Sequence, residues 1–495
     1  MKYISTRGNN QHMTSAQAII AGLAEDGGLF VPEAIPEIDM EFIESLSELS
    51  YQERAVKVLS LFLTDYTQEE IAGCVERAYG SGKFDDEAVA PLNIMDELSV
   101  LELWHGPTSA FKDMALQLLP QLLSTALKKT GEKNQVLILV ATSGDTGKAA
   151  LEGFRDVDQT KIIVFYPENG VSRIQRMQMV TQQGANVAVT AVRGNFDDAQ
   201  SGVKAIFSDK EFNEKLNHAG VSLSSANSIN WGRLVPQIVY YFSAYADLLK
   251  AGRIKAGDKI SFTVPTGNFG DILAGYYALR MGLPVEKLIC ASNTNNVLTD
   301  FLKTGVYDRN RAFYKTISPS MDILISSNLE RLLYHITDDA AQVAGWMQQL
   351  ADEGRYDVGK EVLDKIQAVF GCDWADDKKT MDTINEVYGK RQYIADTHTA
   401  VAWRNAEDYM SNGHHEPMVV VSTASPYKFN ESVLTALQQS IDGMDEFQLL
   451  EKLQAMNSFA IPAGLAALKD EPVRHHAVVD KTGMEKAVED FAQAE

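Results

Sequence analysis

The sequence has few cysteines, little positive charge and no long apolar run. Its three cysteines, Cys74, Cys290 and Cys372, lie far apart without CxxC spacing. Scattered thiols in an odd number predict neither a disulfide framework nor a zinc site, and are typical of a reducing compartment. The first residues, MKYISTRGNN, lack the apolar region of a signal peptide, and no stretch approaches the roughly 18 apolar residues that span a bilayer. We therefore expect a cytoplasmic protein.

Positive charge is outweighed by negative charge. The chain has 45 Lys and Arg residues and 67 Asp and Glu residues, which gives a net charge of -22. Nucleic acids and anionic membranes attract basic faces, so we expect neither as a partner. The nine histidines show no HExxH spacing, and no Ser/His/Asp set is recognisable, so we expect no metal site and no such triad. An anionic small ligand must then be held locally, against the field of the whole molecule.

The length of the chain predicts more than one domain, because 495 residues exceed one ordinary core. Residues 1–95 are predicted to form a small, mostly helical domain. Residues 96–330 are predicted to form an α/β core with two lobes. A helical insertion is expected over residues 331–395, which are rich in acidic residues and helix formers. Residues 396–495 are expected to complete the α/β core.

The predicted core alternates apolar strands with amphipathic helices. VLILVA precedes TSGDTGKAALEGF, KIIVFY precedes VSRIQRMQMVTQQG, and ISFTVP precedes TGNFGDILAGYYALRMG. This alternation predicts an α/β fold in which parallel sheets are covered by helices. Ligands in such folds bind beyond the carboxyl ends of the strands, where the polar loops of these units lie.

Two of these loops have the composition of an anion site. TGNFGDILAG at 266–275 follows a strand and opens a helix, so its amide groups can converge on a phosphate at the helix N-terminus. TSGDTGKAA at 142–150 is a second loop of this type. Each could equally be a tight turn or a simple helix cap without a ligand. Neither matches GxGxxG or GxxxxGK[ST], so NAD and P-loop nucleotides are not favoured.

Lys112 stands at the start of a predicted long, buried helix. The residues on its own face are apolar, namely Leu116, Leu119 and Leu123, and Pro120 is expected to interrupt the helix. Two interpretations remain open. The lysine extends to solvent from the helix end, which is the commoner fate, or it is a desolvated amine kept for chemistry such as imine formation with an aldehyde.

Two further segments carry polar groups at predicted strand or helix ends. In TASPYKF, Thr423 follows a buried strand, where its hydroxyl could meet a cofactor ring nitrogen or could make an ordinary turn hydrogen bond. In NSINWGRL, Asn230 and Arg233 precede an apolar helix. Arg233 could bind an anion through its forked guanidinium, or could pair at the surface.

Taken together, these motifs resemble the threonine synthase family of pyridoxal-phosphate (PLP) enzymes, which has the tryptophan-synthase-β-like fold, fold type II. Any one motif is unspecific, but the set occurs in family order over nearly the whole chain. The matching segments are STRG, GLAEDGGLFVP, HGPTSAFKD, TSGDTGKAA, RGNFDDAQ, NSINWGRL, PTGNFGD, DTHTAVA and TASPYKF.

The resemblance implies a set of cofactor residues. The family's cofactor lysine falls on Lys112, the hydroxyl facing the ring nitrogen on Thr423, and the cofactor-phosphate loop on Gly267, Asn268, Phe269, Gly270 and Asp271. Related members of the fold often have Asn where this chain has Asp145, so the partner of the ring 3-hydroxyl stays open. The substrate phosphate is left among Ser143, Thr146, Asn230 and Arg233.

The reaction implied by the resemblance converts O-phospho-L-homoserine and water to L-threonine and phosphate. This is a lyase reaction with an imine-bound substrate, and the last step of threonine biosynthesis. Lys112 would be the catalytic base that moves protons at substrate carbons. The alternatives are another PLP enzyme of this fold, such as a serine/threonine dehydratase or a cysteine synthase, a catalytically silent ligand-binding relative, and a nucleotide-binding regulator. The expected oligomeric state is a monomer or a weak homo-oligomer.

Overall fold

The computed structural model describes the whole chain except Asn10, Ser143, Gly170, Asn457 and Glu495. Its largest sheet has six strands and is parallel apart from one edge. The spatial order is β13 (Phe370–Trp374), β10 (Val285–Ser292), β9 (Ile260–Pro265), β14 (Met418–Ser422), β4 (Leu98–Glu102) and β3 (Leu92–Ile94). Only β3 pairs antiparallel, along β4.

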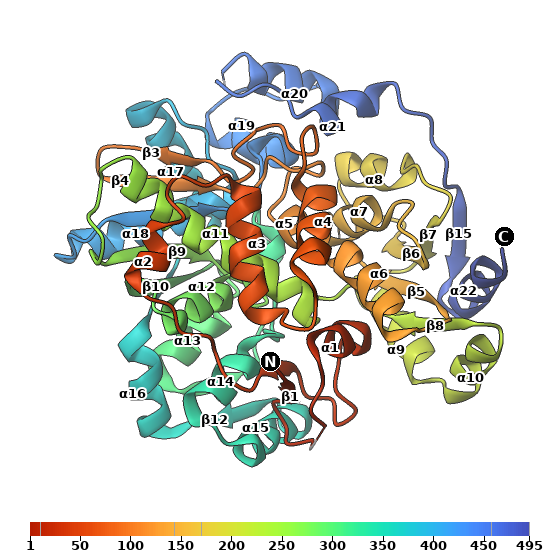
Figure 1. Ribbon diagram of the computed structural model, residues 1–495. Coiled ribbons are helices and arrows are strands. Elements are labelled where there is room, and N and C mark those ends of the chain that lie inside the picture. Colours follow the sequence, from red (N-terminus) through yellow and green to blue (C-terminus); the bar gives the residue numbers. More distant parts are fainter. Residues whose placement is uncertain (10, 143, 170, 457, 495) are drawn as a thin grey trace.

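The second sheet is entirely parallel and has five strands. Their order is β15 (Ala477–Asp480), β7 (Val187–Arg193), β6 (Thr160–Pro167), β5 (Gln135–Ala141) and β8 (Val221–Ser224). Every residue of β6 is buried, as are the inner residues of β5, because helices cover both faces. Figure 1 shows this sheet on the right and the larger one on the left. Parallel sheets covered by helices confirm the expected fold class.

Helices fill the space between and around the two sheets. α7 (Asp145–Phe154) and α9 (Phe196–Ser208) pack on the smaller sheet, and α18 (Thr397–Ser411) packs on the larger one. The remaining helices of this part are α6 (Leu119–Thr130), α8 (Arg173–Val180), α10 (Lys210–His218), α13 (Val297–Thr304), α19 (Asn430–Ala436), α20 (Glu446–Gln454), α21 (Ala463–Ala466) and α22 (Met484–Gln493). Among the described helices, none combines the length and the apolar character that a membrane crossing requires.

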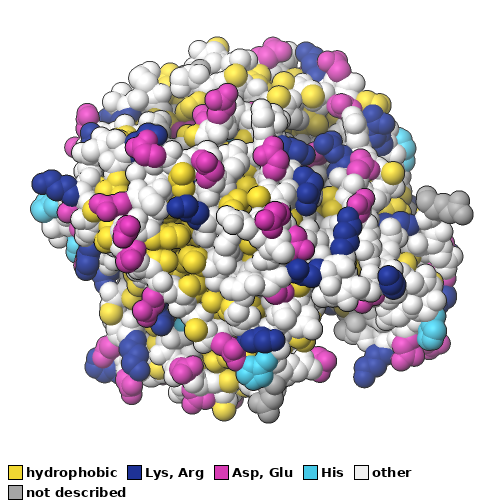
Figure 2. All heavy atoms as spheres, in the orientation of Figure 1, with side chains coloured by type: hydrophobic (Ala, Val, Ile, Leu, Met, Phe, Trp, Pro, Cys, Tyr) yellow, Lys and Arg dark blue, Asp and Glu magenta, His cyan; other side chains and the backbone are white. Residues whose placement is uncertain are grey.

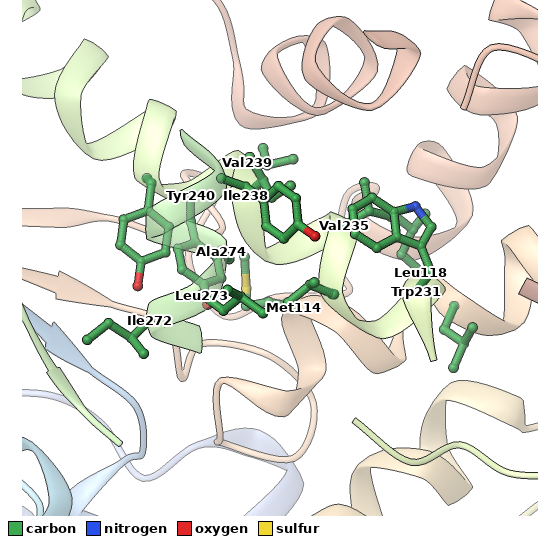
Figure 3. Packing of buried hydrophobic residues seen from close by; sticks show 14 of the residues in the cluster. Met114, Leu118, Trp231, Val235, Ile238, Val239, Tyr240, Ile272, Leu273 and Ala274 are labelled. Atoms are coloured by element: carbon green, nitrogen blue, oxygen red, sulfur yellow. The ribbon is translucent and has the colours of Figure 1, made fainter. Parts of the chain in front are cut away.

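The core between the sheets is built on three helices, α5 (Lys112–Leu116), α11 (Trp231–Lys250) and α12 (Gly270–Met281). Figure 3 shows Met114 of α5 among side chains of α11 and α12, including Val239 and Leu273. The buried helix expected after Lys112 is in two pieces. α5 ends before Pro120, whose ring nitrogen cannot donate to the preceding turn, and α6 begins afresh. This break confirms the expected interruption.

Residues 1–95 form mostly helices, and they share the central core. The helices are α1 (Ser15–Ala21), α2 (Met40–Glu44), α3 (Tyr51–Phe62) and α4 (Gln68–Tyr79), with the short sheet of β1 (Tyr3–Ser5) and β2 (Phe30–Pro32). Ser50 caps α3 and Thr67 caps α4, each in a capping box with the Glu three residues on. α3 packs on α11 and α1 packs on α6, so this part has no separate core.

Residues 331–395, expected to be a helical insertion, contain two strands as well. Their helices are α14 (Leu329–Thr337), α15 (Ala340–Asp352), α16 (Gly359–Val369) and α17 (Asp377–Arg391). β12 (Arg355–Asp357) pairs with β11 (Val306–Asp308), and β13 extends the six-stranded sheet beside β10. The segment is therefore joined to the core by backbone hydrogen bonds, in addition to side-chain packing. At the other end, β14 and β15 place residues 396–495 in both sheets.

Candidate active site

Three adjacent parallel strands bring the predicted site residues to one edge of the larger sheet. β9, β14 and β4 are neighbours, and their carboxyl ends lead into residues 266–271, Thr423 and residues 105–112 respectively. β5, in the other sheet, leads into α7 and Asp145. Because ligands of parallel sheets bind beyond the carboxyl ends of strands, this junction is the candidate site.

The segment before Lys112 is held by two sets of hydrogen bonds. The Phe111 amide donates to the Thr423 carbonyl at 2.8 Å, which ties the start of α5 to the end of β14. Asp113 accepts from both the amide and the hydroxyl of Thr108, each at 2.8 Å. Gly106 has no room for a side chain, since a Cβ there would lie 2.5 Å from the Cβ of Asp113. Asp113 therefore fixes the turn from which Lys112 projects.

Lys112 is directed into the protein and not toward solvent. Its side chain is 13% exposed, and its Nζ lies 4.0 Å from Oδ2 of Asp145. The same Nζ lies 5.1 Å from the centre of the Phe111 ring. Burial lowers the pKa of the Lys112 amine below its ordinary value, Asp145 opposes this shift, and the charges of Lys428 and Arg233 add to it. The structure therefore favours the desolvated amine over the solvent-extended one.

Asp145 joins this lysine to a second one. Lys428 lies in the turn η2 (Pro426–Phe429), and its Nζ is 2.7 Å from Oδ1 of Asp145. Gln175 donates to the same oxygen at 3.2 Å. Burial alone would favour the neutral acid, but the two lysines and the hydrogen bonds hold the pKa of Asp145 well below its usual range. Asp145 is thus a buried carboxylate between two amines.

The loop between β9 and α12 offers free amide groups. In the described part of the chain, none of the amides of residues 267–271 donates a hydrogen bond to backbone or side chain. Phe269 adopts a left-handed backbone with φ of 64°, which turns the chain into the helix. A side chain on Gly267 would meet the Ser320 carbonyl oxygen at 2.9 Å. These amides at a helix N-terminus form the cradle expected for a phosphate.

The Asp271 carboxylate faces away from this cradle. It accepts hydrogen bonds from the hydroxyls of Tyr240 at 2.6 Å and Tyr241 at 2.9 Å, both on α11. Burial raises the pKa of Asp271 to about 6, although the two hydroxyls oppose the shift. Any contact of Asp271 with an anion must therefore be made by its backbone amide.

Arg233 supplies a buried positive charge without an acidic partner. Its Nη1 donates to the Ala226 carbonyl at 2.6 Å, while its Nε is buried with no partner. Burial lowers its pKa to about 10. No carboxylate of the described residues forms an ion pair with it. An unpaired buried guanidinium is costly, so its place beside Lys112 indicates an anionic ligand.

The other candidates for the substrate phosphate differ in position. Asn230 accepts from the Gly232 amide and donates to the Ile19 carbonyl, so both atoms of its amide group are used in capping α11 and anchoring α1. Thr146 lies half-buried in the first turn of α7, beside Asp145. Ser143 lies outside the described residues.

These groups fit pyridoxal phosphate. Lys112 offers an amine for the aldehyde, and the amides of 267–271 offer donors for a phosphate. Thr423, which is buried at the end of β14, offers a hydroxyl for a ring nitrogen. The three come from one edge of one sheet, so a single flat ligand with a phosphate at one end would bridge them. The amides of residues 267–271, which donate to no group of the described residues, are the observation that carries this fit.

Sequence reasoning missed Lys428 and the role of His398. Lys428 lies inside TASPYKF, but nothing in that motif indicates burial. His398 accepts from the Ser320 amide at 3.1 Å through Nε2, so its Nδ1 donates to Asp396 at 2.7 Å. It thereby holds the Ser320 turn against Gly267. The aspartate two residues before the histidine is the only signal of this arrangement in the sequence.

Known families match nearly the whole chain. The model described as "Threonine synthase N terminus" matches residues 2–79, "Pyridoxal-phosphate dependent enzyme" matches residues 94–425, and "Threonine synthase, C-terminal" matches residues 399–491. Threonine synthase from Pseudomonas aeruginosa is 43% identical over 436 residues, which cover 88% of this chain and 90% of the relative. Threonine synthase from Saccharomyces cerevisiae is 39% identical over 467 residues, covering 88% and 89%.

Solved structures agree with the sequence relatives. The PLP-bound threonine synthase from Brucella melitensis has a TM-score of 0.89 and 40% identity, with 100% of both chains covered. These matches confirm the resemblance inferred from the motifs, the PLP fold and the cofactor. The chain belongs to the threonine synthase family and is a pyridoxal-phosphate-dependent enzyme.

Proposed function

We propose that this enzyme converts O-phospho-L-homoserine and water to L-threonine and phosphate, with Lys112 as its cofactor lysine and catalytic base. The observation that carries the proposal is the Lys112 amine, whose side chain is only 13% exposed, at the sheet edge that also carries the free amides of residues 267–271 and within the influence of the Arg233 charge. The reaction needs two phosphate sites, one for the cofactor and one for the substrate. An acidic protein with a net charge of -22 has to build both locally.

We assign the two anion sites to separate elements. The amides of Gly267, Asn268, Phe269, Gly270 and Asp271 would hold the cofactor phosphate, and Thr423 would face the ring nitrogen. Arg233 would hold the substrate phosphate, with Thr146 as a neighbour at the N-terminus of α7. Asn230 would support Arg233 by capping the helix that carries it, without direct contact to the substrate.

Lys112 and Arg233 would each have a distinct role in the reaction. When bound, PLP supplies an aldehyde that holds the substrate amine and an electron sink for charge at the neighbouring carbon. Lys112 takes the proton from Cα and carries protons between Cα, Cβ and Cγ. Arg233 neutralises the phosphate that leaves from Cγ, and water adds at Cβ. Atoms balance, since one water enters and one phosphate leaves.

A phosphate-release assay tests this function against the other PLP reactions. The holoenzyme is supplied in turn with O-phospho-L-homoserine, serine, threonine and O-acetylserine. We expect phosphate and threonine in equal amounts from the first and negligible turnover of the others. Absence of phosphate release, or faster turnover of serine or O-acetylserine, would refute the proposal.

Lys112→Ala tests the assignment of the lysine. The variant should lose both the violet absorbance of the lysine-bound cofactor and turnover, because alanine has no amine to bond to the aldehyde. Lys148→Met is a matched control, since Lys148 is a half-buried lysine of α7 that pairs with Glu152. If Lys112→Ala keeps the absorbance and the turnover, the assignment is wrong.

We also propose the division at residues 1–95, 96–330, 331–395 and 396–495, a cytoplasmic location and a monomeric or weakly associating state. Three free cysteines support a reducing compartment. Residues 1–95 share a core with α6 and α11. We therefore propose the first boundary as a change in chain topology and not as a border between two separate cores. Light scattering at several concentrations measures the state of association, and a stable mass of twice the chain or more would exclude it.

A further inference from the structure

Lys428 is an unusual residue for its position. Its side chain is 0% exposed, and its ammonium group is held by Asp145 at 2.7 Å and by the Thr108 carbonyl at 2.9 Å. Lysine is almost never fully buried unless it is paired, so this position has a specific demand for a cation. The cation is not needed for packing, because an apolar side chain would fill the same space without desolvating a charge.

Asp145 is the group that requires a cation at position 428. This carboxylate lies 4.0 Å from the Lys112 amine on one side and 2.7 Å from Lys428 on the other. If both lysines and Asp145 were charged, the buried group would carry a net charge of +1. If Lys112 is the neutral member, Lys428 and Asp145 cancel. Because burial disfavours net charge, the arrangement selects the state in which Lys112 is a free amine.

The other charges that face Lys112 act in both directions. Asp113, from its own helix, favours the ammonium form, but this carboxylate is bonded to Thr108. Arg233, from α11, disfavours it. The opposing charges of Asp145 in α7 and Lys428 in η2 therefore decide whether the Lys112 amine is protonated. Without Lys428, Asp145 would pair with Lys112 and keep it protonated.

We propose that Lys428 is a positioning residue of this enzyme, which takes up the charge of Asp145 and so leaves Lys112 as the free amine that bonds to the cofactor. The inference rests on the proposed role of Lys112. In that step the Lys112 nitrogen uses its lone pair to attack the aldehyde carbon, a carbon–nitrogen double bond forms and one water leaves. An ammonium group has no lone pair, so the rate follows the fraction of free amine.

Lys428→Met tests the proposal in the apoprotein. PLP is added over a range of pH, and the rate at which the violet absorbance appears is recorded. We expect the midpoint of this pH profile to rise by about one to two units, which is the effect of an opposite charge within a few ångström. At neutral pH the rate should fall about ten- to hundredfold. Lys148→Met, which removes a half-buried lysine of α7 that pairs with Glu152 instead of Asp145, should keep the wild-type midpoint.

The double variant Lys428→Met/Asp145→Asn separates this role from a merely structural one. It removes both charges of the pair, so the midpoint should return toward that of the wild type, although packing is disturbed further. A midpoint that is unchanged or lower in Lys428→Met, or that stays raised in the double variant, overturns the proposal. If wild-type apoprotein gives no violet absorbance with PLP, the proposed function fails instead.

Chemical labelling of the wild-type apoprotein gives a second readout that needs no variant to fold. Acetic anhydride acetylates a lysine in its free-amine form and not in its ammonium form, and mass spectrometry of the peptides reports the pH midpoint of each lysine. Lys112 should become reactive at a lower pH than Lys360, whose side chain is 84% exposed, after correction for access in the denatured chain. A midpoint for Lys112 equal to or above that of Lys360 overturns the proposal.

Discussion

Arg233 is buried, and none of the described carboxylates forms an ion pair with it. We expect Arg233→Met to raise the KM for the phosphorylated substrate about ten- to hundredfold, as for the loss of one or two charge-assisted hydrogen bonds. Its free energy of unfolding should be unchanged or higher, because an unpaired buried charge is removed. Arg54→Met is the control: Arg54 pairs with Asp247 at 2.7 Å, so its loss should lower stability and leave KM unchanged. Initial rates and urea unfolding measure both quantities, and a destabilised Arg233→Met with normal KM contradicts the assignment.

Asp271 gives the protein an unusual pH dependence of stability. Its pKa is about 6 in the folded chain against an ordinary 3.8, so the folded state holds the proton more tightly than the unfolded state. Its contribution to stability is therefore complete below about pH 4 and is lost as pH rises through 6. Asp271→Asn should gain up to about 3 kcal/mol relative to the wild type between pH 4 and pH 7.

Urea unfolding of both proteins at the two pH values measures this difference, in which all other titrating groups cancel. Cofactor affinity should stay within about threefold, because the side chain faces Tyr240 and Tyr241 and not the cradle. A parallel pH dependence in wild type and variant would show that the carboxylate is not buried as described.

Lys112, Arg233 and Thr423 could be named as candidates from the sequence, because each follows a strand or opens a helix within a motif, and their roles stay predictions. The sequence could not predict Lys428. Burial of that residue depends on Asp145 and Thr108, which lie about three hundred residues away in the chain. The spacing of apolar residues indicates whether a segment is a helix or a strand, but it does not indicate which distant carboxylate contacts a lysine.

At the scale of the element, the loop that opens α12 should tolerate no side chain at Gly267. A Cβ would lie 2.9 Å from the Ser320 carbonyl, a backbone atom that cannot turn aside. Gly267→Ala should therefore displace the cradle and weaken cofactor binding about tenfold or more, as expected for one misplaced phosphate hydrogen bond. Fluorescence titration of the apoprotein with PLP measures the change.

Gly389→Ala is the matched control for that prediction. A Cβ at Gly389, in α17, has no neighbouring atom within 4 Å. The substitution should stabilise the helix by about 0.5–1 kcal/mol and leave cofactor affinity unchanged. Equal effects of the two substitutions on affinity would show that the 267–271 loop is not the phosphate site.

Elements with strong local signals were predictable from the sequence. The strands at 135–141, 160–167 and 260–265 and the helices that follow them are present, because each strand is buried on both faces and reads as one apolar run. β13 was missed. Its five residues, FGCDW, are only partly buried, and the strand exists because β10 supplies its hydrogen bonds. Pairing over about eighty residues has no local signature.

At the scale of the whole molecule, the negative net charge is spread over the surface, whereas the basic groups of the site lie inside. Figure 2 shows acidic and basic side chains interspersed over one face, without a large patch of either sign. Of the basic groups of the site, Lys428 and Arg233 are instead buried and Lys112 is half-buried, at the junction of the two sheets. A surface with a net charge of -22 keeps like molecules apart, while the interior concentrates the positive charge that phosphate requires.

The last residues of the chain belong to the smaller sheet, and this gives a test of the whole fold. β15 pairs with β7, and Met484 of α22 is buried at 1% exposure against α9. Met484→Ala should lower the free energy of unfolding by about 2–5 kcal/mol, the usual cost of truncating a buried methionine. Val478→Thr, at a site 38% exposed in β15, should change it by less than about 0.5 kcal/mol.

Because the active site lies between the sheets, Met484→Ala should bind PLP normally at low temperature and lose it at a lower temperature than the wild type. Calorimetry with cofactor absorbance follows both events. Equal melting of the two variants would mean that residues 477–495 do not share the cooperative unit of the smaller sheet.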